Sequence, residues 1–171
     1  MYNVAVGYDS GVAMTTGVEN TLVGGNSGAA LTSSSRNVAV GFQALSTATA
    51  YNENTAVGYK ALKASTDGYS NTAVGVNSLL ANTTGNINTA IGHAAGTSIT
   101  TGVQNTILGG LAGDALTVGS TNVALGVSAL GADTQGNSSV AIGSSALRLQ
   151  NFTSATDAYN VAIGRAAGEN V

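Results

Sequence analysis

Apolar, small and polar residues recur along this chain with a fixed period of 17 residues. Each unit opens with Asn, continues with Thr or Val, then mostly Ala, then Val, Ile or Leu, and then Gly. We number the positions of a unit from slot one, at this Asn, to slot seventeen. Slot one falls at Asn3, Asn20, Asn37, Asn54, Asn71, Asn88, Asn105, Asn122 and Ser139, and a last copy begins at Asn160 after a spacing of 21. A period this short predicts a solenoid, in which similar coils stack and contact only their neighbours.

Within a unit, slots two to four predict a short β-strand because they are rich in β-branched residues. Slot five is always Gly, which marks a bend that a side chain would obstruct. Slot thirteen is Thr in every regular repeat that reaches it, and slot fifteen is most often Gly. We therefore expect a strand, a bend, a second strand and a polar turn in each coil, with no room for a helix. The predicted fold is an all-β parallel β-solenoid of about ten 17-residue coils, with residues 1–171 forming one repeat domain.

Slots nine and twelve vary together. Where slot nine is Gly, as at Gly28 and Gly96, slot twelve is large and apolar, as at Leu31 and Ile99. Where slot nine is Leu, slot twelve is a small or polar residue, as at Asn82. A close-packed interior with one large hole per coil would demand this exchange, so both slots are expected to fill the same core column.

The first strand carries no charge on either face in any repeat. A strand that is apolar on both sides is usually buried on both sides, yet one coil has only one interior. We expect another copy of the chain to cover the second face. The small Ala and Gly column would let two backbones approach closely there.

Composition narrows the function further. Only 8% of residues are charged and the net charge is −3, so no basic field exists for nucleic acid. Cysteine is absent, which excludes disulfides and thiolate metal sites. No apolar run is long enough to cross a membrane, and no signal peptide precedes Asn3. Because the array starts and stops inside a repeat, we expect it to belong to a longer fibre.

The form N-x-A-[VI]-G-x-x-[AS]-L is clearest in residues 54–62 and 71–79, and it extends over essentially the whole chain. It resembles the head repeats of trimeric autotransporter adhesins and the repeat arrays of bacteriophage tail fibres. The resemblance implies a left-handed parallel β-roll, assembled side by side as a homotrimer and displayed on the surface of a cell or virion. It also implies adhesion or receptor binding without catalysis. The adhesin repeats are shorter, nearer fourteen residues, so the fibre comparison fits slightly better.

No residue pattern points to catalysis, a metal or a cofactor. His93 is the only histidine, in a sixth slot so variable that it is expected to face solvent. The carboxylates, including Asp9 and Asp114, are scattered over the slots and look like solvating charges. The Gly-rich stretches 24–28 and 109–113 lack the Gly-Lys-Ser/Thr of a phosphate-binding loop.

Two other classes remain open as alternatives. Residues 57–62 match one hexapeptide of left-handed β-helix acyltransferases, with His93 as the single candidate base, but residues 63–68 do not continue it and 17 is not divisible by six. The Thr columns at slots two and thirteen could instead bind ice. A stacked Thr ladder within the sheet would equally explain slot thirteen, and a stacked amide ladder would explain the Asn column.

The ninth repeat is four residues longer than the others, with the insertion lying within 148–159. Insertions in solenoids form outer loops and often mark a binding face, although a loop extension without a role is the simpler reading. A receptor-binding site is therefore placed first at Arg148, Phe152, Asp157 and Tyr159. The aromatic residues Tyr51, Tyr59 and Tyr69 are the second choice, since their rings could stack on the sugars of a glycan receptor.

Overall fold

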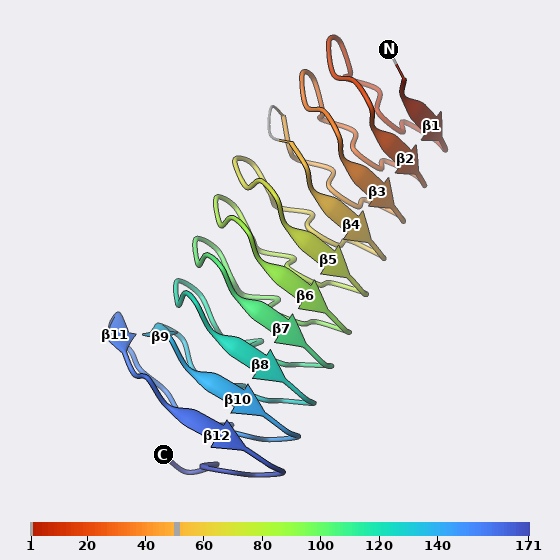
Figure 1. Ribbon diagram of the computed structural model, residues 1–171. Coiled ribbons are helices and arrows are strands. Elements are labelled where there is room, and N and C mark those ends of the chain that lie inside the picture. The colour runs from red at the N-terminus through yellow and green to blue at the C-terminus, as the bar shows by residue number, and fades with distance from the viewer. Residues whose placement is uncertain (1, 50–51) are drawn as a thin grey trace.

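The computed structural model describes residues 2–49 and 52–171, and these residues form a solenoid without a helix. Its main sheet has ten parallel strands in the order β1-β2-β3-β4-β5-β6-β7-β8-β10-β12, stacked like the steps of a staircase (Figure 1). The strands of this sheet are β1 (Val4–Val6), β2 (Thr21–Val23), β3 (Val38–Val40), β4 (Thr55–Val57), β5 (Thr72–Val74), β6 (Thr89–Ile91), β7 (Thr106–Leu108), β8 (Val123–Leu125), β10 (Val140–Ile142) and β12 (Val161–Ile163). A separate pair joins β9 (Gly136–Asn137) to β11 (Thr156–Asp157).

Each strand pairs with the same three slots of the next coil. Thr55 of β4, for example, lies opposite Thr72 of β5, and Val57 lies opposite Val74. The register holds through the long ninth repeat, where Val140 lies opposite Val161. The predicted all-β parallel solenoid with 17-residue coils is thereby confirmed.

The predicted second strand directly after the Gly bend is wrong, and β9 lies later in its coil, at slots fifteen and sixteen. Slots six to eleven form turns instead, because the backbone at slots seven and nine is left-handed, with φ of 57° at Asn77 and 48° at Leu79. Strands need an extended backbone, which these angles exclude. Two hydrogen bonds close the turns of this coil, from Ser78 N to Gly75 O and from Asn82 N to Leu79 O.

The glycine bend of slot five is confirmed. Gly92 has a φ of +140°, and a Cβ atom built on it would lie 2.6 Å from the carbonyl oxygen of Gly109 in the next coil. Neither the dihedral angle nor the spacing admits a side chain. The strand therefore ends at the same place in every coil.

The interior is a narrow column of small residues with one large apolar side chain in most coils. Slot three is fully buried in the coils between the two ends of the rod, as at Ala56 and Ala73. Leu31 and Leu79 are also fully buried, although they occupy slots twelve and nine respectively. In the coil where slot nine is Gly28, a Cβ atom on that residue would lie 2.7 Å from Leu31 Cδ1. The two slots therefore share one space, as their covariation predicts.

The Asn column forms the predicted amide ladder. The backbone N–H of Asn71 donates to Asn54 Oδ1 at 3.0 Å, and Asn71 Nδ2 donates to the carbonyl oxygen of Gly85 at 2.9 Å. Asn71 Oδ1 in turn accepts from the backbone N–H of Asn88 at 2.9 Å. Because these side chains are fully buried, each one satisfies backbone groups that water cannot reach.

Candidate functional site

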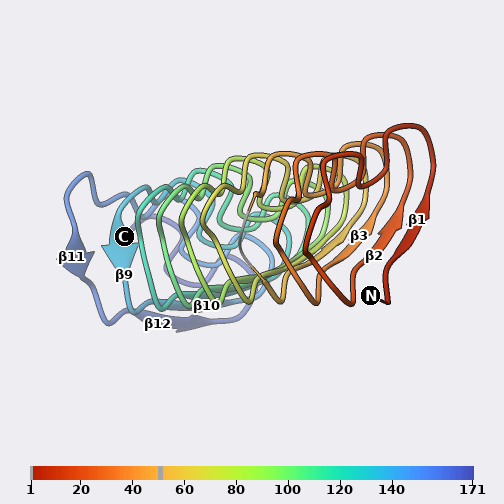
Figure 2. The ribbon, with the colours of Figure 1, turned by 90° about the horizontal axis from the view of Figure 1, so that it is seen from above.

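An uncharged surface lies on the outside of the main sheet, and we call it the strand face. It consists of slots two and four, because the side chain of slot three between them points into the core. Its residues are Val4, Val6, Thr21, Val23, Val38, Val40, Thr55, Val57, Thr72, Val74, Thr89, Ile91, Thr106, Leu108, Val123, Leu125, Val140, Ile142, Val161 and Ile163. Viewed from above, these strands lie side by side along the rod (Figure 2).

The strand face exposes large apolar side chains even in the middle of the rod. Leu108 is 41% and Leu125 39% exposed. The expectation that the Ala and Gly column would lie at a contact between chains is wrong, since Ala56 and Ala73 are fully buried inside their own coils. Any chain that covers this face would meet Thr, Val, Ile and Leu side chains.

The Thr residues of the strand face differ from those of slot thirteen. At slot thirteen, the Thr83 hydroxyl donates to the carbonyl oxygen of Thr100 at 3.1 Å, and Thr100 repeats the bond to Thr117 at 3.2 Å. This is the structural ladder expected for that column. Among the described residues, the slot-two hydroxyls such as those of Thr72 and Thr89 make no hydrogen bond within the chain. They are free to bond a partner or water.

Slot six borders the strand face and carries a pair of stacked aromatic rings. The rings of Phe42 and Tyr59 lie 5.8 Å apart between centroids with an interplanar angle of 14°, and Lys60 Nζ lies 4.8 Å from the Tyr59 centroid. These contacts occupy ring surface that a stacked sugar would need. Tyr69, another second-choice residue, is 43% exposed in slot sixteen of the same coil, and Tyr51 lies outside the described residues.

The insertion forms an outer loop at the C-terminal end of the rod. One residue is added before Phe152, because Phe152 O accepts from Thr134 Oγ1 at an offset of 18 residues, where the same bond in a regular coil spans 17. Two more are added before β11, where Asp157 bonds Asn137 at an offset of 20 and Thr156 lies opposite Gly136. The fourth is added between β11 and β12, where the offset between coils reaches 21. The β9–β11 pair sets this loop apart from the main sheet (Figure 2).

A buried polar cluster holds the base of this loop. Asp133 is fully buried, and its Oδ1 accepts from the backbone N–H groups of Gly136 at 2.9 Å and Phe152 at 3.1 Å. Gln150 Nε2 donates to Asp133 Oδ2 at 2.6 Å, and Gln150 Oε1 accepts from Asn160 Nδ2 at 2.8 Å. Gln150 thus links the Asn column across the break at Ser139, and the expectation that the carboxylates are all solvating charges is wrong for Asp133.

Of the four residues predicted first for receptor binding, three lie in the inserted loop and one lies before it. Phe152, Asp157 and Tyr159 lie in the inserted loop, where Tyr159 is 71% exposed and Asp157 Oδ1 accepts from Asn137 Nδ2 at 3.2 Å. Arg148 precedes the loop in slot ten and pairs with Glu169 at 2.7 Å. The pairing was not visible in the sequence, because the insertion shifts Glu169 to 21 residues from Arg148.

No three His, Asp or Glu side chains in the described part of the chain are grouped so that they could hold a metal ion. His93 is exposed in slot six, as its variable column predicts. The described residues also include no helix that could cross a membrane.

Comparison with known proteins adds no relative. A scan against protein-family models and searches of curated proteins and of solved structures found no match.

Proposed function

We propose that this chain is a structural and adhesive segment of a homotrimeric surface fibre, of the kind found in phage tail fibres or bacterial adhesin heads. The observation that supports this proposal is the strand face, which stays uncharged over all ten strands and exposes Leu108 and Leu125. Exposed surfaces without charge and with many large apolar side chains often mark interaction sites. Three copies packed side by side would bury their strand faces and leave the turns and the inserted loop free.

In this proposal the fibre is displayed outside the cell or on a virion, where it contacts a cell-surface receptor or glycan. The inserted loop, with Phe152, Asp157 and Tyr159, is the first candidate for that contact. The chain performs no reaction and needs no cofactor in this role.

The molar mass in solution tests the assembly. We expect light scattering to give about three times the chain mass of 16.6 kDa. The variant Val74→Lys places a charge in the middle of the strand face, so it should lower the mass towards that of one chain. Thr84→Lys adds the same charge to an exposed turn and should leave the mass unchanged. A wild-type monomer would contradict the trimer.

Ice binding is the second candidate, supported by the free slot-two hydroxyls, which recur in register along the sheet. It requires this face to be open to water, whereas the fibre requires it to be covered. If the protein is a monomer, ice-growth inhibition becomes the next measurement. The double variant Thr72→Val and Thr89→Val should then weaken it, and an unchanged inhibition would exclude this face.

A further inference from the structure

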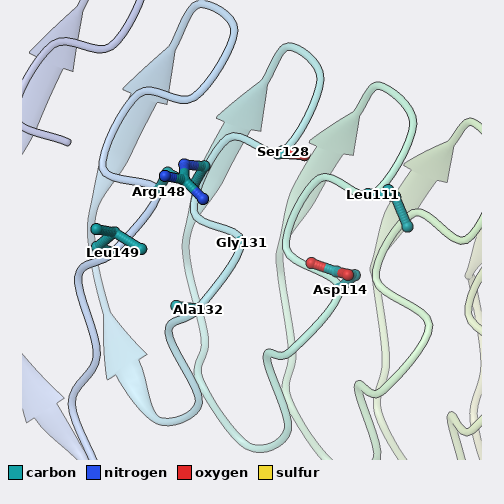
Figure 3. Close-up of a pocket in the computed structure, with 7 residues that line it drawn as sticks. All are labelled: Leu111, Asp114, Ser128, Gly131, Ala132, Arg148 and Leu149. Carbon is teal, nitrogen blue, oxygen red and sulfur yellow. The ribbon is translucent and has the colours of Figure 1, made fainter.

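A groove of about 210 Å³ opens on the turn side of the coils that carry β7, β8 and β10. Its lining residues are Leu111, Asp114, Ser128, Gly131, Ala132, Arg148 and Leu149. In the close-up, Gly131 and Ala132 lie between the coil that carries Asp114 and the coil that carries Arg148 (Figure 3). No residue of the inserted loop beyond position 152 takes part, so the groove is distinct from the loop.

The groove exists because slot ten is Gly in one coil only. Slot ten holds Asp114, Gly131 and Arg148 in three successive coils. A Cβ on Gly131 would lie 3.6 Å from Asp114 Oδ1 and 3.8 Å from Arg148 Cγ. The missing side chain therefore leaves a gap flanked by a carboxylate on one side and an arginine on the other. Coils are about 4.8 Å apart, so Asp114 and Arg148 are separated by roughly two such steps.

The two charged groups of the groove do not neutralise each other. Arg148 turns away to Glu169 in the following coil, with Nε 2.7 Å from Oε1. Asp114 makes no ion pair among the described residues. Partial burial raises the pKa of the Asp114 carboxyl, while hydrogen bonds from the backbone N–H groups of Asp114 and Ala115 partly oppose the rise. Hydrogen bonds donated by a ligand would stabilise the charged form of the Asp114 carboxyl group.

The charges select among ligand classes. An anionic ligand would gain little at Arg148, because Glu169 already neutralises the guanidinium and would repel it. A cationic ligand would gain at Asp114 but meet Arg148. A neutral ligand with several hydroxyls can donate to Asp114 Oδ1 and accept from the free guanidinium nitrogens of Arg148 without either penalty.

The side chains that line the groove and its volume restrict the class of ligand further. Leu111 and Leu149 are 42% and 46% exposed, so the groove offers apolar surface next to its polar groups. The carbonyl oxygen of Ser128, 3.2 Å from the Cβ position of Gly131, is a further acceptor. Drug-sized ligands occupy about 300–1,000 Å³, so this groove is suited to one small ring.

We infer that the groove at Gly131 binds a single neutral sugar unit through Asp114 and Arg148, with the C–H groups of the sugar against Leu111 and Leu149. The inference rests on the proposed attachment function for its natural source of sugar, a surface glycan. It places the sugar contact beside the inserted loop rather than on the aromatic residues.

The test uses the intact protein and free D-glucose, D-galactose and D-mannose at up to about 100 mM, since single small ligands gain only limited free energy. We expect at least one sugar to shift the NMR signals of the Gly131 and Ala132 amides in a saturable way. The variant Gly131→Thr should abolish these shifts, because its side chain fills the groove. Thr already occupies slot ten at Thr97, so the fold accepts it there. Asp114→Asn should weaken binding at least fivefold, while Ser46→Thr, a slot-ten change in a distant coil, should leave it unchanged.

Three outcomes would overturn the inference: no shift with any of the three sugars, shifts that persist in Gly131→Thr, or groove shifts produced by free glycine but by no sugar. The molar mass separates this result from the fibre proposal. If the protein is a trimer that binds no sugar, only the inference about the groove is overturned. If it is a monomer whose sugar binding depends on Gly131, only the proposal of a trimeric fibre is overturned.

Discussion

At the scale of single residues, the unusual property of this chain is how many side chains it holds on a left-handed backbone. Slots seven, nine and seventeen have positive φ in the described coils, and they include Leu79 at 48° and Ile87 at 59°. For residues other than Gly, Asn and Asp this conformation costs about 1–2 kcal/mol. The interlocked coils maintain it, because the same residues donate hydrogen bonds along the stack, as Ile87 N does to Tyr69 O.

The variant Ile87→Asn should stabilise the protein by about 1 kcal/mol, because Asn tolerates a left-handed backbone and Ile does not. Ile87 is 50% exposed, so little buried surface is lost. Chemical denaturation measures the difference. Thr84→Asn, a nearby exposed residue without positive φ, is the matched control and should change the stability by less than about 0.5 kcal/mol.

The variant Gly92→Ala should destabilise the protein by more than about 2 kcal/mol, since its Cβ would meet the Gly109 carbonyl and its φ is left-handed. Gly110→Ala is the control from the neighbouring column. Its nearest neighbour would be the carbonyl oxygen of His93 at 4.0 Å, so its stability should stay within about 1 kcal/mol of the wild type. Equal melting temperatures for the two variants would contradict this account of slot five.

At the scale of the coil, features that repeat as a column could be predicted from the sequence, and features that depend on one coil could not. The strand, the Gly bend and the Asn ladder each recur at one slot, so their spacing predicts their stacking. The turn at slots six to eleven was predicted as a strand because slot nine alternates between Gly and Leu, and a Leu such as Leu79 does not reveal the positive φ that it shares with Gly96. The groove could not be predicted, because it is the absence of one side chain at Gly131 on a surface whose orientation only the structure gives.

The alternation of the large side chain between slots nine and twelve can be tested by substitutions within one coil. Leu79→Gly alone should cost about 2–5 kcal/mol through the cavity it leaves, and Asn82→Ile alone about 1–3 kcal/mol through overpacking. The double variant recreates the arrangement of Gly96 and Ile99 in the next coil. It also removes the Asn82 amide, whose two polar atoms are buried without a hydrogen bond.

We therefore expect the double variant to be at least as stable as the wild type, with a coupling energy of more than about 3 kcal/mol in a double-mutant cycle. Denaturant unfolding of all four proteins provides the measurement. Simple additivity of the two single changes would mean that the slots do not share one space.

At the scale of the whole molecule, the solenoid is nearly one-dimensional, because each strand of the main sheet contacts only the strands next to it. Its stability should behave as a sum of coils and of interfaces between neighbouring coils. No single coil is then required for the others to fold.

Deleting residues 71–87 removes one complete coil and joins slot seventeen to slot one, so the protein should still fold. Its denaturant m-value should fall by about one tenth, in proportion to the surface lost. Deleting residues 71–86 instead shifts the register by one residue, which would turn the strand face inward on one side of the junction. This second variant should lose the cooperative transition in circular dichroism, and equal behaviour of the two deletions would contradict the stacking model.

The parallel stack also determines how the rod would respond to force. The two chain ends lie at opposite ends of the staircase (Figure 1), so tension between them pulls across the strands and loads the hydrogen bonds one coil at a time. Each coil that detaches frees 17 residues, or roughly 58 Å of extended chain at about 3.4 Å per residue. Under load the segment would lengthen in nearly equal steps, with one longer step at the ninth coil. It would thereby dissipate mechanical energy and limit the peak force between the parts joined to its two ends.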